Sequence, residues 1–145
     1  MGDLPGFVRR FMKEQLMYDP FFSHLEEAWG HRDSENLLFI WFEEMKTDLR
    51  SVVERVSQFL DSPLSPDQTD QLLNHLDFKN FKNNPAVNNE VWKSFGLTCN
   101  EGNFIRKGEV GGWKRELENY PETEEELLKW VQEKMESSQI EFPTK

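Results

Sequence analysis

A short stretch of the chain, "NFIRKGEVGGWKRE" at residues 103–116 (the basic loop), combines basic side chains with bare backbone. Glycine lets backbone amides approach an anion closely, and Arg and Lys add charge and directed donors, so this loop is suited to hold a phosphate. A second interpretation stays open, in which the loop is a surface turn that balances the acidic segment 116–136, with its eight Glu against two Lys. The basic residues are Arg106, Lys107, Lys114 and Arg115, and the glycines are Gly108, Gly111 and Gly112.

The rest of the chain is acidic. It has 145 residues, a formal net charge of -10, 37% hydrophobic residues and 13% aromatic residues, a composition that indicates a globular protein. A nucleic-acid-binding protein would spread Lys and Arg over a whole face, which one loop does not do. The sequence shows no apolar leader and no run of eighteen apolar residues, and the single Cys99 cannot form an internal disulfide. We expect a cytoplasmic protein that binds neither nucleic acid nor a membrane.

No other group of side chains has the spacing of a metal site or a catalytic centre. Paired Cys and His are missing, and acidic clusters such as Glu43-Glu44 are typical of solvated helix faces. His24, His31 and His75 are each more typical of surface or helix-end positions than of a catalytic base. We predict no metal site and no catalytic residue in this chain.

The elements that must position the basic loop are mostly helical. Ser65 as a cap, Pro66 at the first helical position and Gln68 three residues after the cap predict the start of one helix, which should run to about His75. Residues 88–103 show no clear periodicity and are expected to form a loop. The other predicted helices are 7–16, 21–29 after a break at Asp19-Pro20, 49–60, 78–82 and one that starts near Pro121.

One segment has the pattern of a buried strand. Residues 36–42, "NLLFIWF", are almost continuously apolar and too short for a clear helical pattern, and the helix at 49–60 follows them as in α/β proteins. A single strand cannot satisfy its own backbone groups, so we expect a sheet that is incomplete within this chain.

Three segments together resemble the cytosolic sulfotransferases. "RKGEVGGWK" is similar to the family's carboxy-terminal Arg-Lys-Gly-x-x-Gly-Asp-Trp-Lys signature. "NLLFIWFEEMKTDL" resembles its strand-to-helix segment, and "HLDFKNFKNNPAVN" resembles its His-x-Ser-Phe-x-x-Met-x-x-Asn-Pro segment. "NYPETEEELLKWVQEKM" is similar to the terminal helix of invertebrate members. The resemblance runs from about Phe7 to Phe142, in family order.

The resemblance implies an α/β fold, the carboxy-terminal part of a P-loop-like parallel sheet flanked by helices, here mostly helical with one clear strand. It also implies the donor 3'-phosphoadenosine 5'-phosphosulfate, whose 3'-phosphate Arg106, Lys107 and Gly108 would hold. Phe78 and its neighbour Phe81 would wall the adenine.

The chain departs from the family pattern at three places near this site. Phe42 occupies a cofactor-site position where the family usually has Tyr, which removes one possible polar contact. Leu76-Asp77 replaces Thr-Ser or Leu-Ser, and Gly112 stands where the signature has Asp. The family's dimerisation motif would begin at Lys114 and is not matched, so we do not predict that dimer.

The family's phosphosulfate loop, catalytic His and further 3'-phosphate ligands precede the segments matched here. We therefore expect residues 1–145 to be the carboxy-terminal half of a sulfotransferase domain, either a fragment or a shortened product, and inactive by itself. The implied reaction moves a sulfuryl group to a hydroxyl or amine of a small acceptor, which the sequence does not name. The alternative is a non-catalytic nucleotide-binding or protein-interaction module derived from a sulfotransferase.

Overall fold

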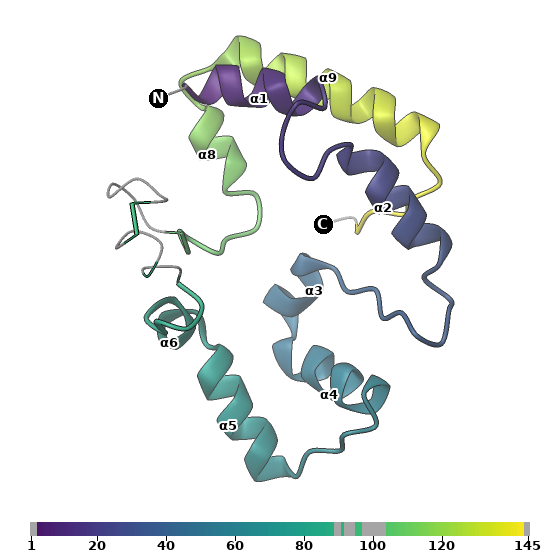
Figure 1. The fold of residues 1–145 in the computed structure, drawn as a ribbon, viewed down its shortest axis with the longest axis vertical. Coiled ribbons are helices and arrows are strands. Elements are labelled where there is room, and N and C mark those ends of the chain that lie inside the picture. The colour runs from purple at the N-terminus through teal and green to yellow at the C-terminus, as the bar shows by residue number, and fades with distance from the viewer. Residues whose placement is uncertain (1–2, 89–90, 92–94, 97–103, 144–145) are drawn as a thin grey trace. The chain divides into compact units, whose positions relative to one another are not determined.

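The computed structural model describes residues 3–88, 91, 95–96 and 104–143, and every regular element within them is a helix (Figure 1). The chain divides into two compact units, Met1–Phe39 with Trp113–Lys145, and Ile40–Gly112. The first unit holds α1 (Leu4–Met12), α2 (Phe21–Gly30), α8 (Trp113–Leu117) and α9 (Pro121–Ser137). The second holds α3 (Phe42–Thr47), α4 (Leu49–Phe59), α5 (Pro66–Leu76) and α6 (Phe78–Lys82).

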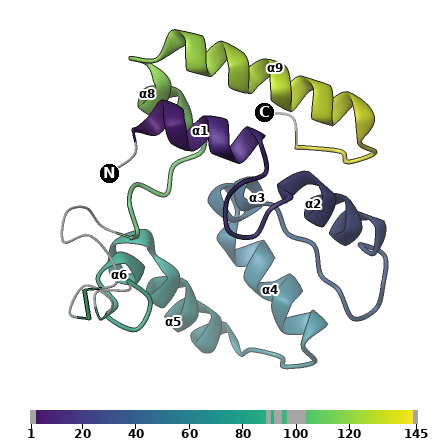
Figure 2. The ribbon, with the colours of Figure 1, turned by 45° about the horizontal axis from the view of Figure 1, so that its top comes forward.

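An aromatic cluster joins the two ends of the chain in the first unit. α1 lies along α9 in both ribbon views (Figures 1 and 2). The ring of Trp130 on α9 lies 5.3 Å from Phe11 of α1 and 5.3 Å from Phe22 of α2, edge to face in both pairs. Such pairs add to the stabilisation that comes from burying the rings. The cluster therefore makes α1 and α2 depend on a helix formed near the end of the chain.

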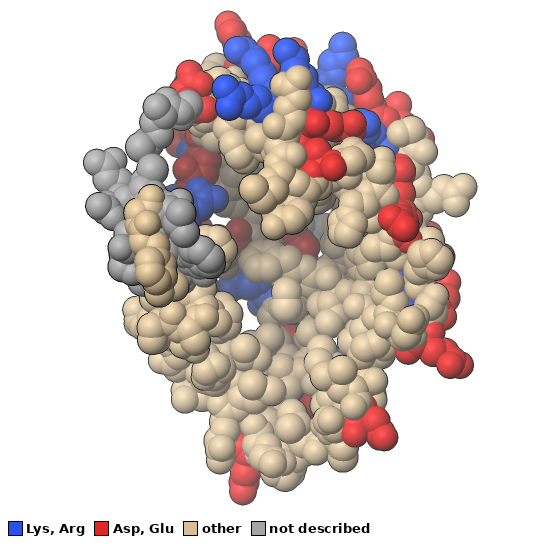
Figure 3. Space-filling view, in the orientation of Figure 1, with Lys and Arg blue, Asp and Glu red and all other residues tan. Residues whose placement is uncertain are grey.

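Charged side chains surround this cluster. Lys, Arg, Asp and Glu lie intermingled over α1 and α9 (Figure 3). Arg9 Nε lies 3.2 Å from Glu126 Oε2, and Lys134 Nζ lies 3.3 Å from Glu14 Oε1. Because these pairs are exposed to solvent, they contribute little to stability beside the aromatic contacts.

The segment after α9 packs against α2. Trp29 Nε1 donates a hydrogen bond of 3.0 Å to the carbonyl of Gln139, and Ile140 is buried. The segment "QIEF" at 139–142 has no sequence pattern that predicts this packing. Two apolar residues in so short a segment do not establish a period, so only the tertiary contact reveals the packing.

In the second unit the expected helix starts are confirmed. Ser65 Oγ accepts a 3.3 Å hydrogen bond from the amide of Gln68, while Gln68 Oε1 accepts one of 2.8 Å from the amide of Ser65. Pro66 is the first residue of α5, as predicted. α4 and α5 contact each other, and their buried residues are Val52 and Val53 of α4 and Thr69 of α5.

The predicted strand at 36–42 is wrong. Residues 37–41 are half-buried and irregular, and Phe42 already belongs to α3. Within the described part of the chain no second extended segment pairs with them. Leu37 donates its amide to Ser34 in a turn, and Trp41 donates its amide to the Glu44 carboxylate. An apolar run favours extended backbone, but a strand exists only where a neighbour completes the hydrogen-bond ladder.

Other differences concern element boundaries. The helix predicted to reach Leu16 ends at Met12. A short helix that was not predicted, α3, ends before Asp48, whose carboxylate accepts the Ser51 amide at 3.1 Å and caps α4. α8 forms inside what the sequence suggested was all loop. Most of the loop expected at 88–103 lies outside the described residues.

Candidate functional site

A cavity of about 680 Å³ lies within the Ile40–Gly112 unit. Its walls come from α3, the start of α4, the junction of α5 with α6, and residues 105–108 of the basic loop. The lining is mainly apolar and aromatic, with three charged residues. The residues that line it are Phe42, Met45, Lys46, Leu49, Leu76, Asp77, Phe78, Phe81, Ile105, Arg106 and Gly108.

Five of the six residues proposed from the sequence for nucleotide binding line this one cavity: Phe42, Phe78, Phe81, Arg106 and Gly108. They come from three segments separated by more than twenty residues each, so their meeting is a property of the fold. Lys107 is exposed and does not line the cavity, although it lies between two residues that do.

The junction between α5 and α6 explains how two of the aromatic residues reach the cavity. Asp77 ends α5 and caps α6, and its Oδ1 accepts a 3.0 Å hydrogen bond from the amide of Lys79. Phe78 and Phe81 are three residues apart on α6 and so share one face of it. The Asp77 carboxylate thus has a structural role in starting the helix that presents these rings.

The basic loop approaches α6 at Gly108. This residue has φ +60°, in the left-handed region that favours glycine, and its backbone packs on the ring of Phe78. Lys82 Nζ, at the other end of α6, donates a 3.2 Å hydrogen bond to the carbonyl of Arg106. α6 therefore contacts the basic loop at two residues that line the cavity, at the backbone of Gly108 and at the carbonyl of Arg106.

Lys46 is a cavity residue that the sequence reasoning did not propose. Its Nζ lies 5.7 Å from the centre of the Phe78 ring. Lys46 follows Phe42 by four residues on α3, so the two share a face, and this spacing was the available signal. The cavity wall thus carries two cations, Lys46 and Arg106.

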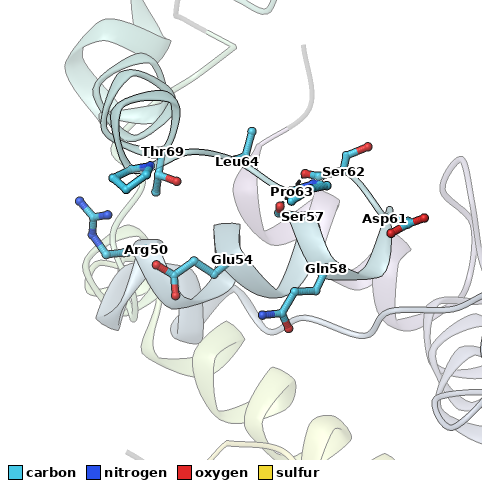
Figure 4. A pocket seen from close by; sticks show the side chains of 10 residues that line it. Arg50, Glu54, Ser57, Gln58, Asp61, Ser62, Pro63, Leu64 and Thr69 are labelled. Carbon is cyan, nitrogen blue, oxygen red and sulfur yellow. Dashed lines mark hydrogen bonds between the residues drawn. The ribbon is translucent and has the colours of Figure 1, made fainter.

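A second hollow, of about 510 Å³, lies between α4 and α5 and differs in character. Arg50, Glu54, Ser57 and Gln58 of α4 line it, together with Ser62, Pro63 and Leu64 of the loop that precedes α5 (Figure 4). Arg50 is ion-paired with Asp70, which raises the pKa of its guanidinium. None of the six proposed site residues lines this hollow.

Within the described residues, no group of three or more His, Cys, Asp or Glu is arranged to hold a metal ion. In the same part of the chain, none of the helices combines the length and the apolar character that a bilayer crossing needs.

Comparison with known proteins gives consistent similarities. The chain is 37% identical over 133 residues to luciferin sulfotransferase of Photinus pyralis, covering 89% of this chain and 35% of that protein. It is 33% identical over 141 residues to amine sulfotransferase of Oryctolagus cuniculus, covering 96% of this chain and 46% of that protein. The chain thus spans less than half the length of these relatives.

The solved structures agree in fold. Retinol dehydratase, crystallised with androsterone and the inactive cofactor PAP, superposes with a TM-score of 0.88 at 31% identity, over 99% of this chain and 41% of that one. The family model for the sulfotransferase domain matches residues 2–139. A match over nearly the whole chain, with relatives and structures in agreement, shows that this chain belongs to the sulfotransferase family.

Proposed function

We propose that this chain is the carboxy-terminal, nucleotide-binding half of a cytosolic sulfotransferase domain that uses 3'-phosphoadenosine 5'-phosphosulfate. The observation that carries the proposal is the convergence of Phe42, Phe78, Phe81, Arg106 and Gly108 on one cavity. In the complete domain the sulfuryl group would pass to a hydroxyl or amine of a small acceptor.

The cavity fits such a nucleotide in size and chemistry. Small-molecule sites are typically about 300–1,000 Å³, mostly apolar, with a few placed polar groups. Aromatic rings at Phe78 and Phe81 offer a wall for a purine, and the Arg106 guanidinium offers directed donors to a phosphate. Lys46 adds a second cation on the same wall.

The role of these residues is to bind and orient the donor. Among the described residues that line the cavity there is no histidine, and the Asp77 carboxylate caps α6, so we expect the purified chain to bind nucleotide without transferring sulfate. Saturable sulfuryl transfer by the purified chain would contradict that part of the proposal.

Titration calorimetry with adenosine 3',5'-bisphosphate tests the binding. Arg106→Ala should weaken binding by tenfold or more, because a hydrogen bond to a charged group is worth about 1.5–3 kcal/mol. Lys114→Ala removes the same charge from a residue outside the cavity and is the matched control. Raising the salt concentration should weaken binding, since exposed charges are screened over about 8–10 Å.

The rival interpretation, a basic turn that only balances the acidic helix, predicts no binding and no difference between the two variants. If the chain alone binds too weakly to measure, the same titration is made on a protein in which a sulfotransferase amino-terminal half precedes it. Absence of binding there as well would overturn the proposal.

A further inference from the structure

The basic loop is held to α6 at two points of different kinds. At the first residue of the helix, the Phe78 ring packs on the backbone of Gly108. At the last residue, Lys82 Nζ donates 3.2 Å to the carbonyl of Arg106. The ring contact is non-directional, whereas the hydrogen bond fixes the direction in which one carbonyl points.

Holding the Arg106 carbonyl in one direction also constrains the neighbouring amide and the Arg106 side chain. The peptide that joins Arg106 to Lys107 is planar, so fixing its carbonyl also fixes its amide, which points the opposite way. The same constraint limits the backbone angles of Arg106, and these set the direction in which its side chain leaves the loop. One lysine on α6 therefore acts on both basic residues proposed for the phosphate.

We propose that Lys82 is a positioning residue for the anion-binding loop, acting through the backbone of Arg106 rather than by contact with the ligand. Lys82 is half-buried and does not line the cavity. The expected effect of Lys82 on nucleotide affinity rests on the proposed function. Its effect on the loop backbone can be tested without any nucleotide.

Three variants separate the hydrogen bond from the charge. Lys82→Met removes the donor and the charge but keeps an unbranched side chain, and Lys82→Arg keeps both donor and charge. Lys79→Met removes the same charge from an exposed position on the same helix and is the matched control. All are made in the full 145-residue chain, with circular dichroism as the check of folding.

Two nucleotides identify the route by which Lys82 acts. Lys82→Met should bind adenosine 3',5'-bisphosphate about five- to tenfold more weakly than Lys79→Met does, and Lys82→Arg should recover most of that loss. Adenosine 5'-monophosphate lacks the 3'-phosphate, so its affinity should not differ between the two Met variants. Equal weakening by both Met variants would mean that only charge matters, and equal loss of both nucleotides in Lys82→Met would mean general damage. Either result overturns the proposal.

Trypsin provides the test that needs no ligand. It cleaves after Arg106 and Lys107, and cleavage requires the local backbone to open. Lys82→Met should yield the fragments ending at these residues several-fold faster than Lys79→Met does, as measured by mass spectrometry. Equal rates overturn the positioning role whatever the nucleotides do. If none of these proteins binds nucleotide while the rates differ, the positioning role is supported, and the proposed function is decided by the titration of the protein that carries a sulfotransferase amino-terminal half.

Discussion

The backbone of Gly108 lies against the ring of Phe78 so closely that no side chain fits between them. A Cβ at position 108 would lie 2.7 Å from Cδ2 and 3.2 Å from Cζ of the ring. Thirty residues separate the two along the chain, yet their contact closes one side of the candidate site. This contact makes the residue type at 108 a condition for the loop to dock on α6.

Gly108→Ala should destabilise the chain more than Gly96→Ala. Both glycines have positive φ, which costs an alanine about 1–2 kcal/mol, but nothing lies within 4 Å of a Cβ at Gly96. The overlap with Phe78 should add roughly 1–3 kcal/mol at position 108. Urea unfolding of both variants measures the difference. Equal losses of stability would show that the ring yields without cost.

Phe42→Tyr should strengthen binding of adenosine 3',5'-bisphosphate. Phe42 lines the cavity and is 43% exposed, so a phenol hydroxyl there has room to reach a polar ligand atom, as the Tyr usual in the family would. One added hydrogen bond is worth about 0.5–1.5 kcal/mol, or roughly two- to tenfold in affinity. Phe59→Tyr makes the same change at a 39% exposed residue that does not line the cavity, and it should leave the calorimetric affinity unchanged.

Ser65→Ala should destabilise the second unit by about 1 kcal/mol, because it removes the acceptor that caps α5. Ser51→Ala, at an exposed position within α4, is the control and should stay within about 0.5 kcal/mol of the original chain. Denaturant unfolding followed by circular dichroism checks both. A loss no larger at Ser65 than at Ser51 would show that the cap contributes nothing to stability.

The contribution of Glu44 to the stability of the fold should be lost as the pH falls. Its carboxylate accepts the Trp41 amide at 3.0 Å and Arg55 Nη1 at 3.1 Å, and chiefly the first of these lowers its pKa from the ordinary 4.5. A lowered pKa means that the ionised form stabilises the fold above about pH 4.5, and that this contribution is lost as the pH falls through the folded-state value. Glu44→Gln should therefore be less stable than the original chain at pH 7 and approach it in acid.

Glu43→Gln leaves both of those bonds in place and serves as the control for the acid series. Thermal unfolding measured from pH 7 downward gives the comparison. A constant difference between Glu44→Gln and the original chain at every pH would contradict the assignment to ionisation.

The sequence predicted best where the signal is local. The Ser65, Pro66 and Gln68 pattern identified the start of α5 because a capping box is made within four residues. The apolar run at 37–41 gave a wrong strand prediction. Apolar residues indicate burial, whereas a strand also needs a partner segment from elsewhere in the chain. The hydrogen bond from Trp29 to Gln139 and the burial of Ile140 likewise had no local signal.

The candidate site illustrates the same division. Arg106 and Gly108 stood out because basic residues beside glycine are chemically suited to anions, and the family motif added Phe78. Lys82 did not stand out, because its value lies in a hydrogen bond to a carbonyl 24 residues away, which a motif does not display. Every residue type has a backbone carbonyl, so the residue at the acceptor position gives no sign in the sequence that a distant side chain will bond to it.

The aromatic cluster of Phe11, Phe22 and Trp130 also sets an order for the synthesis of this chain. At about 5–20 residues per second, Trp130 is made roughly 5–20 s after α2 has been completed. During that interval the apolar faces of α1 and α2 lack the helix that covers them, whereas the second unit, residues 40–112, is contiguous in the sequence. A ribosome stalled before α9 should therefore carry a nascent chain in which residues 4–30, with α1 and α2, are open to chaperones and proteases.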